Sequence, residues 1–237
     1  MKTYRYLSIP IVLLVLLISC SGEKKKLFGS GDSSRWTDQD IPLSELDTVR
    51  VNTDSIIIAD KMKELFPPSD SLVEGRPVSF YLNRRDVSLA AKNFYLLRFI
   101  PSDNNETGSL CDSLLTKNDT TRPFYYFLYL RLNKIADGAT AEMLPDAALE
   151  YSMKFVDEFY KKLELPLYRG EYMTWVYNVS YMLWNSLAKG QDTADAASVR
   201  QYIISQQTKN AKYLTASLRN KISQFADSVA THPNDGR

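Results

Sequence analysis

Residues 171–189 read EYMTWVYNVSYMLWNSLAK, and this stretch decides the fold. A helix built from it carries apolar and aromatic side chains on almost every side. A helix without a polar face is normally enclosed by other helices. The stretch therefore predicts a buried central helix, with Trp175 and Trp184 in the core and Gly190 ending it.

Helical periodicity continues on both sides of this stretch. Pro67-Pro68, Pro101 and Pro166 end helices, and Pro123 suits the first turn of one. Only 51–58 and 77–82 have the pattern of strands, and no 34-residue repeat is present. We expect an all-α fold, a single bundle-like domain of about six to seven helices. The expected helices cover residues 54–66, 86–100, 109–116, 121–137, 145–163, 171–189 and 193–231.

The expected helix over 145–163 carries acid–base pairs in the favourable i, i+4 order. These pairs are Glu150 with Lys154, Asp157 with Lys161 and Glu158 with Lys162. Their stripe predicts the solvent-facing side of this helix.

The expected helix over 193–231 is long for so small a domain. At 1.5 Å per residue its 39 residues would span roughly 58 Å, against about 40 Å for a compact domain of this size. Its apolar seam turns polar at Gln206-Gln207-Thr208-Lys209-Asn210, where neither proline nor glycine forces a kink. We expect an uncovered stripe that binds a partner helix; the alternatives are a kink, or an N-terminal segment that folds back over the stripe. The stripe consists of Tyr213, Leu214, Leu218, Ile222 and Phe225.

The N-terminus has the organisation of an export signal. Lys2 and Arg5 precede an aliphatic run over residues 9–18. That run would rise only about 15 Å as a helix, half of the roughly 30 Å hydrocarbon core of a membrane. Its length is therefore typical of a signal peptide rather than a transmembrane span.

The end of the run, Leu17-Ile18-Ser19-Cys20, resembles the lipobox of bacterial lipoproteins. The resemblance implies cleavage before Cys20, acylation of its thiol and anchoring of the mature chain to a membrane. It divides the chain into a signal peptide (1–19), a lipidated flexible tether (20–50), the helical domain (51–231) and a disordered tail (232–237). Ser21-Gly22-Glu23-Lys24-Lys25-Lys26 does not resemble the acid-rich surface-export signal of Bacteroidota lipoproteins, which predicts the periplasmic face of the outer membrane.

Aspartate followed by serine or threonine and a small aliphatic residue or threonine occurs seven times. This pattern is similar to the O-glycosylation motif of exported Bacteroidota proteins, although Asp-Ser and Asp-Thr also cap helices. The match at Asp112 is expected to be buried. The remaining candidate sites are Thr48, Ser55, Ser71, Thr120, Thr193 and Ser228.

Composition and motifs argue against several functions. Without Lys2 and Arg5 the chain has 27 basic and 28 acidic residues, which gives no basic footprint for nucleic acid. The only histidine, His232, lies in the terminal tail, so a histidine-based triad or zinc site is not expected. Glycine-rich phosphate loops are absent, and Cys111 has the surroundings of a packed core thiol. We expect no cofactor, no metal and no enzymatic activity.

Three functions stay open. The first is a non-catalytic helical adaptor or structural subunit of an envelope assembly, one candidate being a contractile secretion apparatus. The second is a glycan or small-ligand binding lipoprotein, which depends on the aromatic clusters over 124–129 and 172–184. The third and weakest is a carboxylate-dependent enzyme, since Glu142, Asp146 and Glu150 share one helical face.

Overall fold

The computed structural model describes residues 64–188 and 195–232. Internal contacts divide the chain into two units, 1–49 and 50–237, and all described residues belong to the second. Helices dominate this part of the chain, beside a hairpin of two short strands, so the predicted all-α fold is confirmed. Within the described ranges, no helix is both long and apolar enough to cross a membrane.

The described part begins with a small hairpin. Strands β1 (Leu72–Val73) and β2 (Arg76–Pro77) pair antiparallel around Glu74 and Gly75, which both have positive φ, 51° and 82°. Positive φ at both central residues is the geometry of a tight hairpin turn. Helix α2 (Val78–Leu82) follows directly. The strand predicted over 77–82 is therefore wrong: Val78 and Tyr81 are buried at helical spacing.

Helices α3 to α6 follow in short succession. Helix α3 (Leu89–Tyr95) is shorter than predicted, because Leu97 adopts a left-handed conformation with φ of 58°. Helix α4 (Asn105–Asp112) runs into the 3-10 turn η2 (Ser113–Leu115). Helix α5 (Arg122–Ile135) begins after Thr121 with Pro123 in its first turn, as predicted, and α6 (Gly138–Glu142) is an additional short helix.

The core is built around two helices. Helix α5 is enclosed over most of its length. Helix α9 (Tyr172–Ala188) lies where the central helix was predicted, but only one of its faces is buried and Tyr177 is exposed, so its predicted burial on all sides is wrong. Trp175 is fully buried and stacks on Tyr126 and Tyr129 with ring centroids 5.3 and 5.2 Å apart. Trp184 is only half-buried, at the edge of the core rather than inside it as predicted.

The helix predicted over 145–163 is broken into two. Helix α7 (Leu144–Lys154) ends at Phe155, whose φ of −110° and ψ of 46° are not helical, and α8 (Val156–Leu163) starts in a new direction. Pro166 then opens the 3-10 turn η3 (Pro166–Tyr168).

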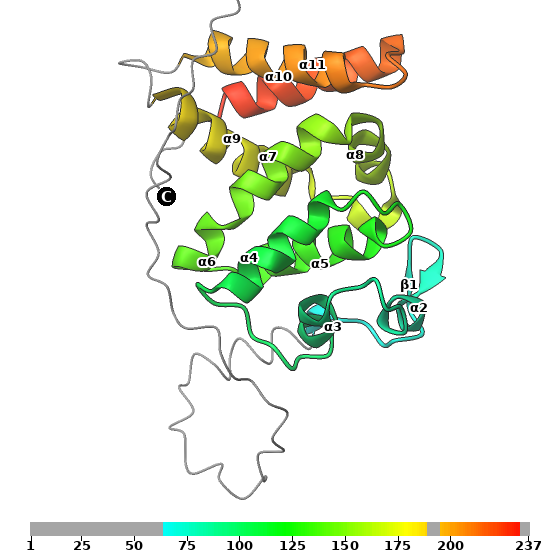
Figure 1. Cartoon of the computed structure of the whole chain (residues 1–237). Coiled ribbons are helices and arrows are strands. Elements are labelled where there is room, and N and C mark those ends of the chain that lie inside the picture. The colour runs from blue at the N-terminus through cyan, green and yellow to red at the C-terminus, as the bar shows by residue number, and fades with distance from the viewer. Residues whose placement is uncertain (1–63, 189–194, 233–237) are drawn as a thin grey trace, which may run out of the picture. The chain divides into compact units, whose positions relative to one another are not determined.

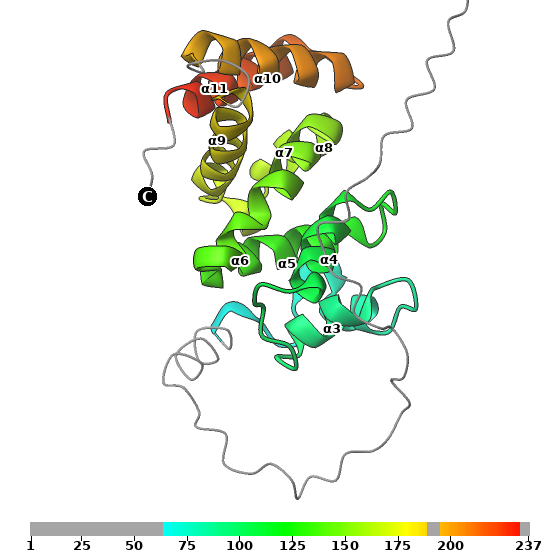
Figure 2. The same cartoon turned by 60° about the vertical axis from the view of Figure 1, so that its left-hand side comes forward.

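The prediction of a single helix over 193–231 is also wrong. Helices α10 (Ala196–Asn210) and α11 (Ala216–Ala230) form a hairpin and lie side by side, as Figures 1 and 2 show. The hydroxyl of Thr215 accepts a hydrogen bond from the Leu218 N–H and starts α11. The Asp157 carboxylate accepts the N–H groups of Lys212 and Tyr213 at 2.7 and 3.2 Å. These caps replace helical hydrogen bonds and turn the chain without proline or glycine.

Candidate functional site

A pocket of about 380 Å³ lies where the first turn of α5, helix α8 and the β1–β2 turn meet. We call it the Arg122 pocket. Charged side chains dominate its lining, which offers no hydroxyl, thiol or imidazole. The lining residues are Glu74, Asp119, Arg122, Pro123, Asp157, Glu158, Lys161, Lys162 and Leu165.

Arg122 is one of two buried cations of the pocket, with its side chain 5% exposed. Its Nε donates to Glu158 at 2.8 Å and its Nη1 to the Thr116 carbonyl at 2.7 Å, while its Nη2 pairs with Asp119. The guanidinium carbon lies 4.2 Å from the centre of the Phe155 ring. Burial lowers the pKa of Arg122, but Glu158 and Asp119 outweigh it and hold the pKa above its ordinary value.

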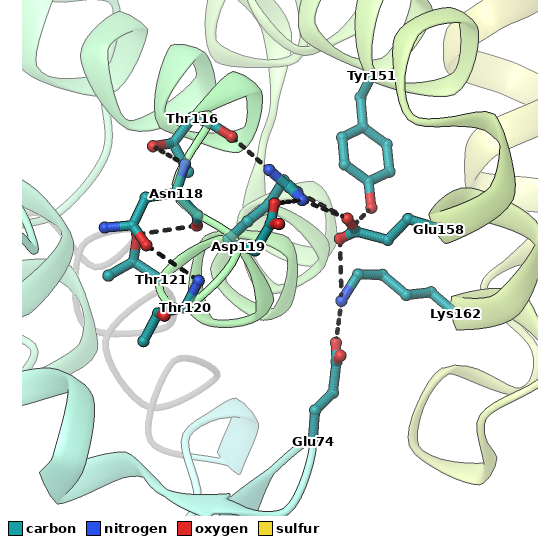
Figure 3. Close-up of polar contacts among 10 residues, drawn as sticks. Glu74, Thr116, Asn118, Asp119, Thr120, Thr121, Tyr151, Glu158 and Lys162 are labelled. Atoms are coloured by element: carbon teal, nitrogen blue, oxygen red, sulfur yellow. Dashed lines mark hydrogen bonds and ion pairs between the residues drawn. The ribbon is translucent and has the colours of Figure 1, made fainter. Parts of the chain in front are cut away.

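Lys162 is the second buried cation, and it lies between two carboxylates (Figure 3). Its ammonium pairs with Glu74 and lies 3.5 Å from Glu158. Tyr168 donates to Glu74 at 3.0 Å, and Tyr151 donates to Glu158 at 3.1 Å. Two cations and two carboxylates thus form a closed group with its hydrogen bonds largely satisfied.

The loop before α5 presents Asp119 at the mouth of the pocket. Asn118 braces this loop. Its side-chain oxygen accepts from the Thr120 N–H at 3.0 Å (Figure 3). Its side-chain amide donates to Asp86 at 2.8 Å. Asp119 itself is 86% exposed and contacts Arg122 through Oδ1.

The α10–α11 turn reaches the same pocket through Asp157. This carboxylate lines the pocket and caps the backbone at Lys212 and Tyr213. The Tyr213 side chain is 64% exposed. The exposed Tyr213 therefore belongs to a turn that is hydrogen-bonded to a residue of the pocket lining.

The stripe predicted to bind a partner helix is largely buried in the domain. Leu218, Ile222 and Phe225 are 9%, 1% and 0% exposed, because α11 packs them against α8 and α9. Leu214 is half-buried. Only Tyr213 of the five stripe residues projects into solvent.

The candidate glycosylation sites differ in accessibility. Thr48, Ser55 and Thr193 lie outside the described residues. In the motif Asp70-Ser71-Leu72, both residues that flank the serine are exposed, Leu72 at 61%. In the motifs at Thr120 and Ser228, the residue after the acceptor is buried; these residues are Thr121 and Val229.

The match at Asp112 is not buried as expected. Asp112 is exposed and Ser113 half-exposed, although Leu114 is buried. The four described acceptors, Ser71, Ser113, Thr120 and Ser228, are all half-exposed, and modification of these sites stays a prediction.

The residues behind the two alternative functions are dispersed. Glu142, Asp146 and Glu150 are exposed on α6 and α7, and Glu150 pairs with Lys154 at 3.2 Å. None of the three lines the Arg122 pocket or a second pocket beside η2, lined by Ser109, Asp112, Ser113, Leu115, Thr116 and Tyr125. The aromatic residues over 124–129 are buried, and in the second cluster Tyr177 is the strongly exposed one, at 59%. The described geometry thus provides neither an aromatic platform in a pocket nor convergent carboxylates from this set.

Cys111 and His232 both have structural surroundings. Cys111 is 2% exposed, and burial raises the pKa of its thiol to about 12. His232, placed by the sequence in a disordered tail, lies against α9: the Ser180 hydroxyl donates to its carbonyl, and its ring contacts Tyr177 edge-on at 5.5 Å. In the described residues, no group of three or more histidine, cysteine, aspartate or glutamate side chains could hold a metal ion.

Arg122 and Lys162 were missed by sequence reasoning. The Glu158–Lys162 spacing indicated a solvent-facing stripe, yet Lys162 is 2% exposed. The sequence around Arg122 does indicate a buried charge. The eight residues that follow Arg122 are all proline, aromatic or leucine. A single charge among such residues requires a partner when it is buried.

Comparison with known proteins gives no independent assignment, since no family model, curated protein or solved structure matches the chain.

Proposed function

We propose that this chain is a lipid-anchored adaptor on the periplasmic face of the bacterial outer membrane, and that it contributes a helical domain to an envelope assembly. The lipobox at Cys20 supports the anchor, and Ser21-Gly22-Glu23-Lys24-Lys25-Lys26 supports the periplasmic face. A contractile secretion apparatus is one such assembly.

One observation carries the adaptor role: the exposed Tyr213 belongs to a turn fastened to the Arg122 pocket. Tyrosine is enriched where proteins meet, and a charged rim around it is typical of a protein interface. The buried cations of the pocket are already paired with carboxylates, which suits a rigid binding surface better than a reacting centre. We call Tyr213, the exposed lining residues Asp119 and Lys161, and the half-buried Asp157 the binding rim.

The binding rim can be tested by photo-crosslinking in living cells. A photoreactive amino acid replaces Tyr213 in the full chain, and the matched control carries it in place of Tyr177, which is similarly exposed but lies on α9. We expect a covalent adduct with one defined envelope protein from position 213 and not from position 177. Equal labelling of many proteins from both positions would contradict a specific binding rim.

A further inference from the structure

Large apolar side chains project into solvent from α3 and from the chain that follows it. Leu89, Leu96 and Ile100 are 70%, 41% and 44% exposed, and they lie within twelve residues of sequence. We call these three residues the α3 face. A single exposed leucine is ordinary on a protein surface, whereas exposed apolar residues that gather in one region indicate a contact surface.

The backbone directs these side chains away from the core. Leu89 and Leu96 lie two turns apart along α3, on the side opposite the fully buried Ala91. Beyond the helix, Phe99 packs against the core and the next side chain, Ile100, is exposed. The α3 face is therefore exposed because the other side of the same segment is fixed in the domain.

The part of the chain that bears the lipid signal joins the domain beside α3. Residues 21–63 separate Cys20 from the first described residue. Phe66, close behind it, contacts Phe94 and Tyr95 of α3 edge-on, with ring centroids 5.0 and 5.5 Å apart. A membrane that holds Cys20 thus holds the domain from its α3 end.

The α10–α11 hairpin lies at the other end of the described domain, as Figures 1 and 2 show. The exposed Tyr213 belongs to the turn of this hairpin. A domain that meets the membrane through α3 therefore leaves this turn on the far side, accessible to a partner protein.

The elements around α3 carry no surplus of basic residues. Lys92, which lies between the two leucines on α3, donates to the Arg84 carbonyl at 2.6 Å, and Arg84 itself pairs with Asp86. Between residues 64 and 103 the bases and acids are equal in number, and Glu106 on the neighbouring α4 adds one acid. Contact with a lipid surface would depend on apolar burial rather than on charge. The residues counted between 64 and 103 are Arg76, Arg84, Arg85, Lys92 and Arg98, against Glu64, Asp70, Glu74, Asp86 and Asp103.

We infer, on the basis of the proposed lipid anchor, that the α3 face contacts the bilayer that holds Cys20 and thereby orients the domain on it. Leucine and isoleucine side chains gain apolar burial at the boundary between head groups and acyl chains. Three such side chains form only a weak contact, but the anchor keeps the domain at a high effective concentration beside the membrane. The weak contact is then populated.

The inference is tested with the lipidated full-length gene product in phosphatidylcholine vesicles. An environment-sensitive fluorophore is attached to Leu89→Cys, and the matched control carries it on Tyr213→Cys, which is similarly exposed at 64%. Labelling is selective, because Cys111 is 2% exposed and the proposed acylation blocks Cys20. When the vesicles contain a lipid with a spin-labelled acyl chain, we expect loss of fluorescence at position 89 and little loss at position 213.

Exposed substitutions separate the α3 face from other apolar surface. Leu96→Ser together with Ile100→Ser should reduce the quenching at position 89. Leu167→Ser, on η3 and 42% exposed like Leu96, should leave it unchanged. Raising the salt concentration to about 0.5 M should also leave it unchanged, because screening weakens contacts between charges and not apolar burial.

Equal quenching at positions 89 and 213 would overturn the inference, as would quenching at position 89 that high salt abolishes. A fluorophore at position 89 that is shielded from water but insensitive to the spin-labelled lipid would overturn it too, because another part of the chain or a protein would then cover the α3 face. A chain that lacks acyl groups and does not stay with the vesicles would instead contradict the proposed anchor.

Discussion

At the scale of single residues, the polar interruption at Gln206–Asn210 has a structural explanation. Gln207 is fully buried; its amide donates to the Ser152 carbonyl at 3.0 Å and accepts from the Tyr160 hydroxyl at 2.7 Å. Asn210 donates to the Met153 carbonyl at 2.8 Å. These carbonyls belong to the last turn of α7, where helical partners are missing. The sequence shows the polar positions, but their partners come from another helix and could not be predicted from spacing.

Gln207 is therefore expected to contribute strongly to stability. Gln207→Leu leaves the Ser152 carbonyl and the Tyr160 hydroxyl buried without this partner, which should lower the free energy of unfolding by about 2 kcal/mol. Urea denaturation measures the change. Gln201→Leu, on the exposed side of the same helix, should stay within about 0.5 kcal/mol of the wild type. Similar losses in both variants would show that the buried hydrogen bonds are unimportant.

At the scale of elements, local signals predicted the helices whose ends are set locally. The start of α5 is marked by Pro123 in its first turn, and α9 by its uninterrupted apolar sequence. The break at Phe155 was not predictable, because apolar spacing continues across it. Before 211–215 the polar positions 206–210 interrupt the seam, but they do not show whether the helix ends there or continues. Long-range contacts accompany each break: Arg122 lies over Phe155, and Asp157 caps the turn at Tyr213. The Arg122 pocket was missed for the same reason, since its residues converge only in the folded chain.

The position of α11 in the core leads to a prediction for the former partner stripe. Phe225 contacts Phe159 with ring centroids 5.2 Å apart, and Leu218 and Ile222 are buried beside it along the helix. Each large-to-small change in a core costs about 2–5 kcal/mol, so three together cost about as much as the whole stability of a typical domain. We expect the Leu218→Ser, Ile222→Ser and Phe225→Ser triple variant to lose its near-ultraviolet circular dichroism.

The control for this variant changes exposed tyrosines of the same hairpin. Tyr202→Ser with Tyr213→Ser should keep a native spectrum and melting temperature, because both side chains are exposed. A folded triple variant with an unchanged melting temperature would place the stripe on the surface after all.

At the scale of the whole molecule, the core is unusually rich in tyrosine, which makes its stability depend on alkaline pH. Burial raises the pKa of Tyr81 to about 12 and that of several others above their ordinary value of 10.0. Unfolded tyrosines lose their protons near that value while the folded chain keeps them, so above it the unfolded state binds fewer protons. Stability must then fall as pH rises. The other strongly affected tyrosines are Tyr126, Tyr129, Tyr151, Tyr160 and Tyr168.

The pH dependence can be measured from melting temperature together with tyrosinate absorbance. We expect a steady melting temperature from about pH 7 to 9, a fall above about pH 10, and tyrosinate absorbance from the core that appears together with unfolding. Complete ionisation of all tyrosines while the helical signal persists would be inconsistent with this core.

The proposals for the folded domain depend on its being held at a membrane by lipid on Cys20. Mass spectrometry of the full-length gene product purified from the membrane fraction tests this directly. We predict a mature chain that begins at Cys20 and carries acyl chains there, and a Cys20→Ala variant that is absent from the membrane fraction. A membrane-bound chain that still begins at Met1, or one with an unmodified Cys20 thiol, would contradict the lipid anchor.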